Sequence, residues 1–496
     1  MANRIMTDGL TKTYGDYDVV VVGHGISGLA SALAAHEAGA TPVILEKAEP
    51  ERRGGHSAHA GGLFRFPMTD PDGVKDRLDL EERPEQYTQQ DFYDDLMDVS
   101  NGEADPDLCS VFVEEAYDAI QWITNHGVTW HVVDHSEEPG FGTTVGALQA
   151  DGEGKGAIDA LTDRVQELGI DIHYETEFRG LDTDETNAIT AARALTPEGK
   201  VRYDAASVVI CAGSYVSNPE MRTRYFGRDG EHYVVRGTRY NTGEALDAAL
   251  DIGALPAGEW GGAHQVMNDA AAAPVEEGRA RINGYQYSVV LNKEGERFID
   301  EGEDFLLKTY AKFGQRVYDQ PDQEAFAIFD ATVDDLVVSQ IDTEPVTAES
   351  LEGLMEKLGI VEPEKAIETI ESYNAATDPD EFDPQSLDGN STSGIEPKKS
   401  NWAIPIDSPP YRCFPMKSAI TFAFGGLKID TKSRVLDRRE TPIPGLWAVG
   451  NSTAEFFYGN YPGGSALTRG TTFGRRAGTQ AADRALEESQ AGITQD

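Results

Sequence analysis

The feature that most constrains the fold is a glycine-rich turn that follows a run of β-branched residues. Residues 18–22 have the composition of a buried parallel strand, and they lead directly into Gly-His-Gly-Ile-Ser-Gly at 23–28. Residues 29–38 then have a helical pattern, and residues 41–45 have the pattern of a second strand, closed by Glu46. This strand–helix–strand order predicts a Rossmann-type unit that binds a dinucleotide.

The glycines of this turn each have a physical reason. Gly23 permits the tight turn, Gly25 lets a pyrophosphate approach the backbone, and Gly28 lets the helix pack closely on the strand. The helix N-terminus that follows offers free N–H groups to phosphates. Glu46 comes 18 residues after Gly28, where its carboxylate can accept the ribose hydroxyls. Its charge disfavours the 2′-phosphate of NADP.

A second glycine-rich segment, near the other end of the chain, favours FAD over NAD. The small residues at 54–62 could lie against a flat isoalloxazine ring, but an ordinary flexible loop has the same composition. Residues 445–451 have the pattern of a buried strand ending in a turn, and residues 461–465 open a helix predicted at 466–488. The N-terminus of that helix would stabilise a reduced, anionic flavin ring, although such a turn can also simply cap a helix.

Four further strings carry a resemblance to a known family. They lie at 292–302, 399–403, 424–427 and 460–464. With the two glycine-rich ends, they resemble the fumarate reductase/succinate dehydrogenase flavoprotein superfamily, and within it the tricarballylate dehydrogenase branch. The resemblance implies an α/β fold: a Rossmann-like FAD-binding domain formed by N- and C-terminal segments, with an inserted α+β cap domain for the substrate. The implied boundaries are 16–262 and 420–484 for the FAD-binding domain, 263–419 for the cap, and 1–15 and 485–496 for the tails.

Inside these boundaries, local patterns predict the remaining elements. Helices are expected at 154–168, 245–250, 349–358 and 363–375, strands at 170–174, 206–211 and 289–292, and a hairpin edge at 201–202. Residues 378–399 are polar and rich in Pro, Gly and Ser, which predicts a long exposed loop.

The motifs and the resemblance together predict a noncovalent FAD site. Succinate dehydrogenases tether FAD through a histidine in a Ser-His-Thr string, and here His56 and His59 are close to that position but out of register. Three widely spaced cysteines give no metal-ligand or disulfide pattern, so no metal site is expected. The predicted cofactor-binding residues are Gly23, Gly25, Ile26, Ser27, Gly28, Glu46, Lys47, Gly55, His56, Ser57, Gly61, Gly62, Ala212, Gly213, Gly450, Asn451, Gly464, Ser465, Ala466 and Leu467.

The resemblance places the substrate between the flavin and the cap. His264 opens the cap where relatives carry a substrate-binding histidine, and with a pKa near neutrality it could clamp a carboxylate or carbonyl. Tyr461 stands where fumarate reductases have an arginine and ketosteroid dehydrogenases have a tyrosine that donates to the substrate carbonyl. Thr421 lies close to the position of a second clamp histidine. Purely structural roles are the alternatives for His264 and Tyr461.

Phe305 is the main departure from the superfamily pattern. Fumarate reductases place a proton-donating arginine at the matching position and ketosteroid dehydrogenases a tyrosine, whereas phenylalanine carries no proton to give. Lys308 or Tyr310 could take over the proton step, although solvent exposure is expected for Lys308. Arg281 and Arg65 are the nearby cations by family position. The predicted catalytic residues are His264, Tyr461, Tyr310 and Arg281.

The reaction implied is an FAD-dependent dehydrogenation of a CH–CH bond next to a carboxylate or carbonyl, similar to that of tricarballylate dehydrogenases. The alternatives are a fumarate-, enoate- or 3-ketosteroid-type reductase or dehydrogenase, and a non-catalytic flavin electron-transfer subunit, against which the large cap argues. The chain has no iron–sulfur cysteine pattern. We therefore expect an external electron acceptor: a quinone, a soluble carrier or an iron–sulfur subunit.

Charge and hydropathy indicate which partners the protein can have and where in the cell it is expected. The formal net charge is −44, from 86 acidic and 42 basic residues dispersed along the chain, which argues against nucleic acid as a partner. Such a surface keeps a protein soluble, and it also suits the salt-rich cytoplasm of a halophile, where counterions screen the repulsion. No apolar run of membrane-spanning length and no secretory h-region occurs, so a cytoplasmic protein is expected.

Overall fold

A six-stranded sheet forms the centre of the computed structural model, which describes residues 10–133, 139–141 and 145–493. The order of its strands is β23-β24-β11-β2-β3-β7, and all neighbours are parallel except β23 and β24. Its strands are β2 (Val19–Val22), β3 (Pro42–Leu45), β7 (Asp171–His173), β11 (Ser207–Ile210), β23 (Arg434–Leu436) and β24 (Pro442–Ala448). Strands from both ends of the chain therefore share one sheet, which confirms the predicted α/β FAD-binding fold.

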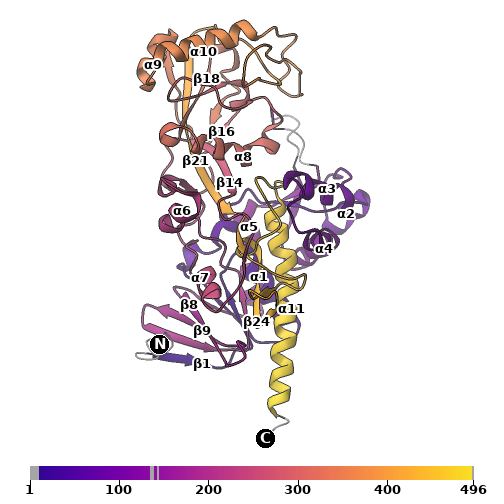
Figure 1. Cartoon of the computed structure of the whole chain (residues 1–496). Helices are drawn as coiled ribbons and strands as arrows, with labels where there is room; N and C mark the ends of the chain where they lie inside the picture. The colour runs from indigo at the N-terminus through magenta and orange to yellow at the C-terminus, as the bar shows by residue number, and fades with distance from the viewer. Residues whose placement is uncertain (1–9, 134–138, 142–144, 494–496) are drawn as a thin grey trace.

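Two helices from opposite ends of the chain pack on each other beside this sheet. They are α1 (Ile26–Glu37) and α11 (Ser465–Ile493), and the long α11 runs down the molecule in Figure 1. A Cβ atom on Gly474 would lie 2.8 Å from the Ser27 carbonyl oxygen, and one on Gly478 would lie 2.1 Å from that of Ser31. Glycine at these positions lets the two backbones approach more closely than any side chain would allow.

A seven-stranded sheet forms the second large layer, in the upper half of Figure 1. Its long central strand, β21 (Tyr411–Ala423), pairs with four other strands. The sheet consists of β12 (Val234–Arg236), β14 (Ala263–Asp269), β15 (Val275–Glu276), β17 (Val289–Asn292), β18 (Glu324–Phe329), β20 (Val346–Ala348) and β21. Helices α8 (Leu306–Tyr318), α9 (Leu351–Leu358) and α10 (Pro363–Ala376) belong to the same part of the chain.

The other elements surround these two sheets. A four-stranded sheet contains β1 (Leu10–Tyr14), β10 (Gly199–Asp204), β9 (Ile189–Thr196) and β8 (Glu177–Thr183). Smaller sheets contain β4 (Leu63–Arg65), β6 (Ala147–Ala150) and β5 (Trp130–Val132), β13 (Pro256–Ala257) with β22 (Gly426–Leu427), and β16 (Ile282–Asn283) with β19 (Val338–Ser339). The remaining helices are α2 (Pro71–Leu78), α3 (Gln89–Val99), α4 (Pro106–Asn125), α5 (Glu153–Glu167), α6 (Pro219–Phe226) and α7 (Glu244–Asp251).

Three segments differ from their sequence-based expectations. Residues 10–14, predicted as part of a tail, form β1 and pair with β10. Helix α11 extends to Ile493, beyond its predicted end, while residues 1–9 and 494–496 lie outside the described part of the chain. The loop at 378–399 is not uniformly exposed, because Asn390 and Thr392 are buried and Lys399 has no exposed surface.

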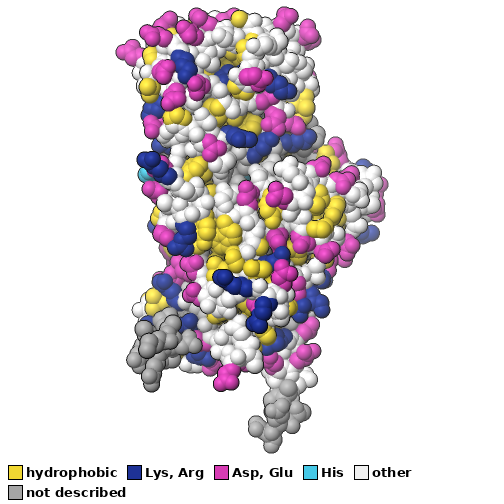
Figure 2. All heavy atoms as spheres, in the orientation of Figure 1, with side chains coloured by type: hydrophobic (Ala, Val, Ile, Leu, Met, Phe, Trp, Pro, Cys, Tyr) yellow, Lys and Arg dark blue, Asp and Glu magenta, His cyan; other side chains and the backbone are white. Residues whose placement is uncertain are grey.

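Acidic side chains are spread over the face of the molecule shown in Figure 2, with no single acidic patch. In the described part of the chain, no helix combines the length and the apolar character needed to span a bilayer.

Candidate active site

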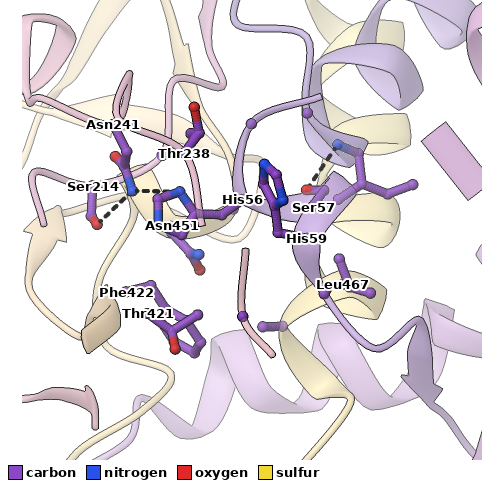
Figure 3. A pocket seen from close by; sticks show the side chains of 18 of the residues that line it. His56, Ser57, His59, Ser214, Thr238, Asn241, Thr421, Phe422, Asn451 and Leu467 are labelled. Atoms are coloured by element: carbon purple, nitrogen blue, oxygen red, sulfur yellow. Dashed lines mark hydrogen bonds between the residues drawn. The ribbon is translucent and has the colours of Figure 1, made fainter. Parts of the chain in front are cut away.

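A cavity of about 500 Å³ opens at the carboxyl edge of the central sheet and extends toward the seven-stranded sheet. The segments that follow β2, β3, β11 and β24 all contribute to its lining, because the carboxyl ends of parallel strands meet at one edge of a sheet. Figure 3 shows side chains around this cavity, among them Thr421 and Phe422 of β21 and residues such as Ser214 and Asn451 that follow strands of the central sheet. It lies within the size range of small-molecule sites in proteins.

Glu46 lies at one end of the cavity with a buried carboxylate. Its Oε2 accepts the backbone N–H of His24 at 2.9 Å, and its Oε1 accepts that of Ala48 at 2.7 Å. These bonds fix the carboxylate at the end of β3. Each of its oxygens keeps a further lone pair that can accept a hydrogen bond from a ribose hydroxyl. The neighbouring Lys47 also lines the cavity, but its ammonium contacts Glu244 at 2.8 Å and Thr242 at 2.5 Å.

The glycines beside the cavity leave room that a side chain would fill. A Cβ atom on Gly450 would lie 2.3 Å from Ser27 Oγ, and one on Gly25 would lie 3.3 Å from Ser57 Oγ. A Cβ atom on Gly28 would lie 1.9 Å from the carbonyl oxygen of Gly23. These contacts agree with the close approach of a pyrophosphate and of helix to strand, so the residues present fit a bound dinucleotide.

Several polar atoms along the cavity have no hydrogen-bond partner among the described residues. The ring of His56 has its Nδ1 3.3 Å from Asn241 Nδ2, and neither His56 Nε2 nor Asn241 Oδ1 has a hydrogen-bond partner among the described residues. Burial lowers the pKa of His56 to about 3, so the ring is neutral. Asn241 also approaches Ser214 Oγ at 3.4 Å (Figure 3). Buried polar atoms of this kind are normally satisfied, and a bound cofactor would satisfy them here.

The far end of the cavity is lined by aromatic rings. The ring of His264 lies 4.8 Å from that of Tyr461, 5.2 Å from that of Tyr310 and 5.4 Å from that of Phe422. β14 places His264 opposite Phe422 on β21. Both ring nitrogens of His264 lack a partner among the described residues.

The protonation of His264 differs from the expectation of a near-neutral pKa. Burial, together with the charges of Arg236 and Arg281, holds the pKa of His264 well below its ordinary value. The ring is therefore neutral and can donate one hydrogen bond and accept another, but it adds no positive charge.

Two phenols meet beside this histidine. The hydroxyls of Tyr310, on α8, and Tyr461, in the loop before α11, are 3.2 Å apart. Burial, and then the neighbouring Tyr310, raise the pKa of Tyr461 well above its ordinary value, so this phenol keeps its proton. A neutral phenol, that of Tyr461, thus occupies the position at which the resemblance implies an arginine in fumarate reductases.

Arg236, which sequence reasoning missed, is a buried cation on the cavity wall. Its guanidinium donates to Thr421 Oγ1 at 3.2 Å and to the Gly278 carbonyl at 2.7 Å, and its Nε lies 3.4 Å from Glu276 Oε1. β12 brings Arg236 next to β21 through a pairing of residues 185 positions apart, and no local motif signals it. Arg281 also lines the cavity, with its guanidinium 5.2 Å from the Tyr310 ring centre.

Several predicted residues lie off the cavity wall. Phe305 precedes α8 and packs against Trp402, 5.9 Å between ring centres, while Lys308 is largely exposed beside Asp304. Arg65 donates to the Gly463 carbonyl at 2.8 Å, and this hydrogen bond stabilises the turn before α11. Gly28 and Ser465 are likewise absent from the lining, whereas every other predicted cofactor-binding and catalytic residue belongs to it.

Comparisons with known proteins agree with this geometry. Residues 18–467 match the family described as FAD binding domain. Urocanate reductase of Eggerthella lenta is 29% identical over 488 residues, which cover 96% of this chain and 75% of the relative. NADH:fumarate oxidoreductase of Klebsiella pneumoniae is 27% identical over 489 residues, covering 95% of this chain and 48% of the relative. The open conformation of a flavocytochrome c3 fumarate reductase has the same fold, with a TM-score of 0.75 at 23% identity, covering 98% of this chain and 81% of that one.

Proposed function

Since the chain belongs to the FAD binding domain family and is an FAD-dependent oxidoreductase acting on CH–CH groups, we propose that it reduces the C=C bond of an unsaturated monocarboxylate. The names of the two curated relatives support the reductive direction. This proposal departs from the tricarballylate-type dehydrogenation that the sequence favoured.

The observation that carries the proposal is the cluster of His264, Tyr310 and Tyr461 at the end of the cavity opposite Glu46. Glu46 and the glycine-rich turn at 23–28 would hold the nucleotide part of FAD, and bound FAD would supply the hydride. His264, Tyr310 and Tyr461 would offer neutral hydrogen-bond donors to a substrate held against them. Donors of this kind stabilise the negative charge that develops on an oxygen as hydride arrives at the conjugated carbon.

The charges at this end favour one carboxylate over three. His264 and Tyr461 are neutral. Arg236 forms an ion pair with Glu276, and both side chains are buried, with 10% and 9% of their surfaces exposed. Arg281 contributes a further guanidinium above Tyr310. Of the other cations that the described residues place in the lining, Lys47 pairs with Glu244 and Arg279 with Glu153. Burying each additional carboxylate would therefore cost several kcal/mol by the usual penalty for buried charge.

The two tyrosines have different roles in the reaction. We assign Tyr310 to hold the proton that reaches the neighbouring carbon, and Tyr461 to hydrogen-bond to Tyr310 and keep its hydroxyl oriented. His264 and Arg281 orient the carboxylate. One hydride and one proton thus add across the double bond and give the saturated acid.

Two further parts of the proposal concern the cofactor and its electrons. FAD is bound noncovalently, and protein precipitated with acid should release it into the supernatant. An external donor, which is a quinone, a soluble carrier or an iron–sulfur subunit, returns electrons to the flavin.

The proposal is tested by mixing dithionite-reduced holoenzyme anaerobically with crotonate, cinnamate, fumarate, aconitate and a 3-ketosteroid enone. Return of the oxidised flavin band should be fastest with the monocarboxylates. Bleaching of oxidised enzyme by tricarballylate, with no reoxidation by any unsaturated acid, would instead establish the dehydrogenase. A protein that binds no FAD would refute both assignments.

A further inference from the structure

Arg469 is a buried cation for which the described residues provide no acidic partner. It lies in the second turn of α11, and only 2% of its surface is exposed. Its guanidinium is held between two rings, 4.8 Å from the centre of Phe456 and 4.6 Å from that of Phe457. No carboxylate among the described residues forms an ion pair with it, and its Nε has no hydrogen-bond partner there.

This placement is unfavourable for an isolated protein. A buried charge without a counter-charge is costly. The partial charge of a helix terminus acts mainly within the first turn, so at Arg469, in the second turn, the helix does not offset this cost. Burial accordingly lowers the pKa of Arg469 to about 9, which leaves the side chain charged at neutral pH. An anion close by would remove this cost.

The contacts of Arg469 lead to the cofactor cavity. Its Nη2 donates to Asn451 Oδ1 at 2.8 Å, and Asn451 lines the cavity (Figure 3). Phe457, which covers one face of the guanidinium, packs on Tyr461 with ring centres 5.5 Å apart. Arg469 therefore supports one residue from the cofactor side of the cavity and, through Phe457, one from the substrate side, without lining the cavity itself.

We propose that Arg469 is a positioning residue that fixes Asn451 and supplies the positive charge that favours the reduced, anionic form of bound FAD. The proposal rests on the FAD-dependent function proposed above. It accounts for the absent counter-charge, because the negative charge would arrive in the cavity with the reduced flavin. A higher flavin potential makes the flavin easier to reduce by its electron donor.

The test is the midpoint potential of the bound flavin, measured spectroscopically against a reference dye in holoenzyme. Arg469→Met keeps the volume and suits the space between two phenyl rings. It should shift the equilibrium between oxidised and reduced flavin about tenfold toward the oxidised form, which is about 30 mV for a two-electron couple. Arg469→Lys, which keeps the charge, should shift it by less than about threefold.

Arg475 provides the matched control. It lies on the same helix, with its guanidinium 5.4 Å from the Trp122 ring centre and away from the cavity lining. Arg475→Met removes the same charge and should leave the flavin equilibrium within about twofold of the wild type.

The positioning part is tested with Asn451→Ala. This change should weaken FAD binding about fivefold in the wild-type background and add little in the Arg469→Met background, since the two residues act through one hydrogen bond. Strictly additive effects would overturn the positioning role.

An unshifted potential in FAD-loaded Arg469→Met would overturn the electrostatic role and leave the proposed function standing, whereas a wild-type chain without any flavin band would overturn both. Should Arg469→Met not fold, Arg469→Gln is the second neutral variant, and an unshifted potential in FAD-loaded Arg469→Gln would overturn the electrostatic role in the same way.

Discussion

Replacing Glu46 with glutamine should weaken FAD binding about ten- to hundredfold. Each carboxylate oxygen of Glu46 accepts a backbone N–H, one from His24 and the other from Ala48. A glutamine amide has only one oxygen, so in either orientation its NH₂ group faces one of these two donors. The local structure loses a hydrogen bond and gains a buried, unsatisfied N–H.

The magnitude follows from the hydrogen bonds that Glu46 would make to the ribose. A hydrogen bond to a charged group contributes about 1.5–3 kcal/mol, and each 1.4 kcal/mol is roughly a factor of ten in affinity. Loss of the negative charge weakens these bonds, because bonds to ionised acceptors are the stronger ones. The unsatisfied backbone donor is present with and without FAD, so it lowers the stability of the protein and not its affinity for FAD.

The assay is quenching of FAD fluorescence on titration of apoprotein. Glu51→Gln is the matched control, because Glu51 is exposed on the same connection after β3 and lies outside the cavity. Its dissociation constant should equal that of the wild type. A Glu46→Gln protein that folds and binds FAD within about twofold of the wild type would refute this account of the ribose site.

Further predictions address the chemistry and the stability. Tyr310→Phe should slow flavin reoxidation by substrate at least about a hundredfold, and adding Tyr461→Phe should cost much less than in the wild type; stopped-flow absorbance measures both. Glu301→Gln should lower the free energy of unfolding in guanidinium by about 3–5 kcal/mol, because it leaves Arg297 buried without its partner. Burial lowers the pKa of His24 to about 3 in the folded protein. As the pH drops below about 6.5, His24 is protonated in the unfolded chain but not in the folded one, so the free energy of unfolding should fall. His24→Leu should reduce that slope by up to about 1.4 kcal/mol per pH unit in chemical unfolding. With a net charge of −44, the melting temperature should rise with KCl up to molar concentrations, and indifference to salt would contradict a halophilic adaptation.

The dinucleotide end of the molecule could be predicted because its signal is local. The turn at 23–28, the strands on either side and Glu46 lie within 30 residues, and short-range sterics dictate each glycine. The resemblance also placed His264, Tyr310 and Tyr461 near one another, and the structure brings their rings together.

The missed features depend on contacts between distant segments. Arg236 reaches the cavity only because β12 pairs with β21, and no motif surrounds it in the sequence. The same arginine, with burial, keeps His264 neutral, so the protonation of that histidine could not be judged from its own neighbours. The burial of Lys399 could not be predicted from its polar neighbours either. Its ammonium donates to the Ser288 carbonyl at 2.8 Å, which holds this part of a polar loop in the interior.

The close packing of α1 against α11 has a consequence for how the protein is made. The glycine-rich turn ends at Gly28, but the helix that completes the cavity begins at Ser465, 437 residues later. A ribosome must therefore translate all of these residues before the two sides of the cavity can meet. FAD loading should accordingly follow the synthesis of α11, and a chain that terminates before α11 would carry the glycine-rich turn without the helix that completes the cavity.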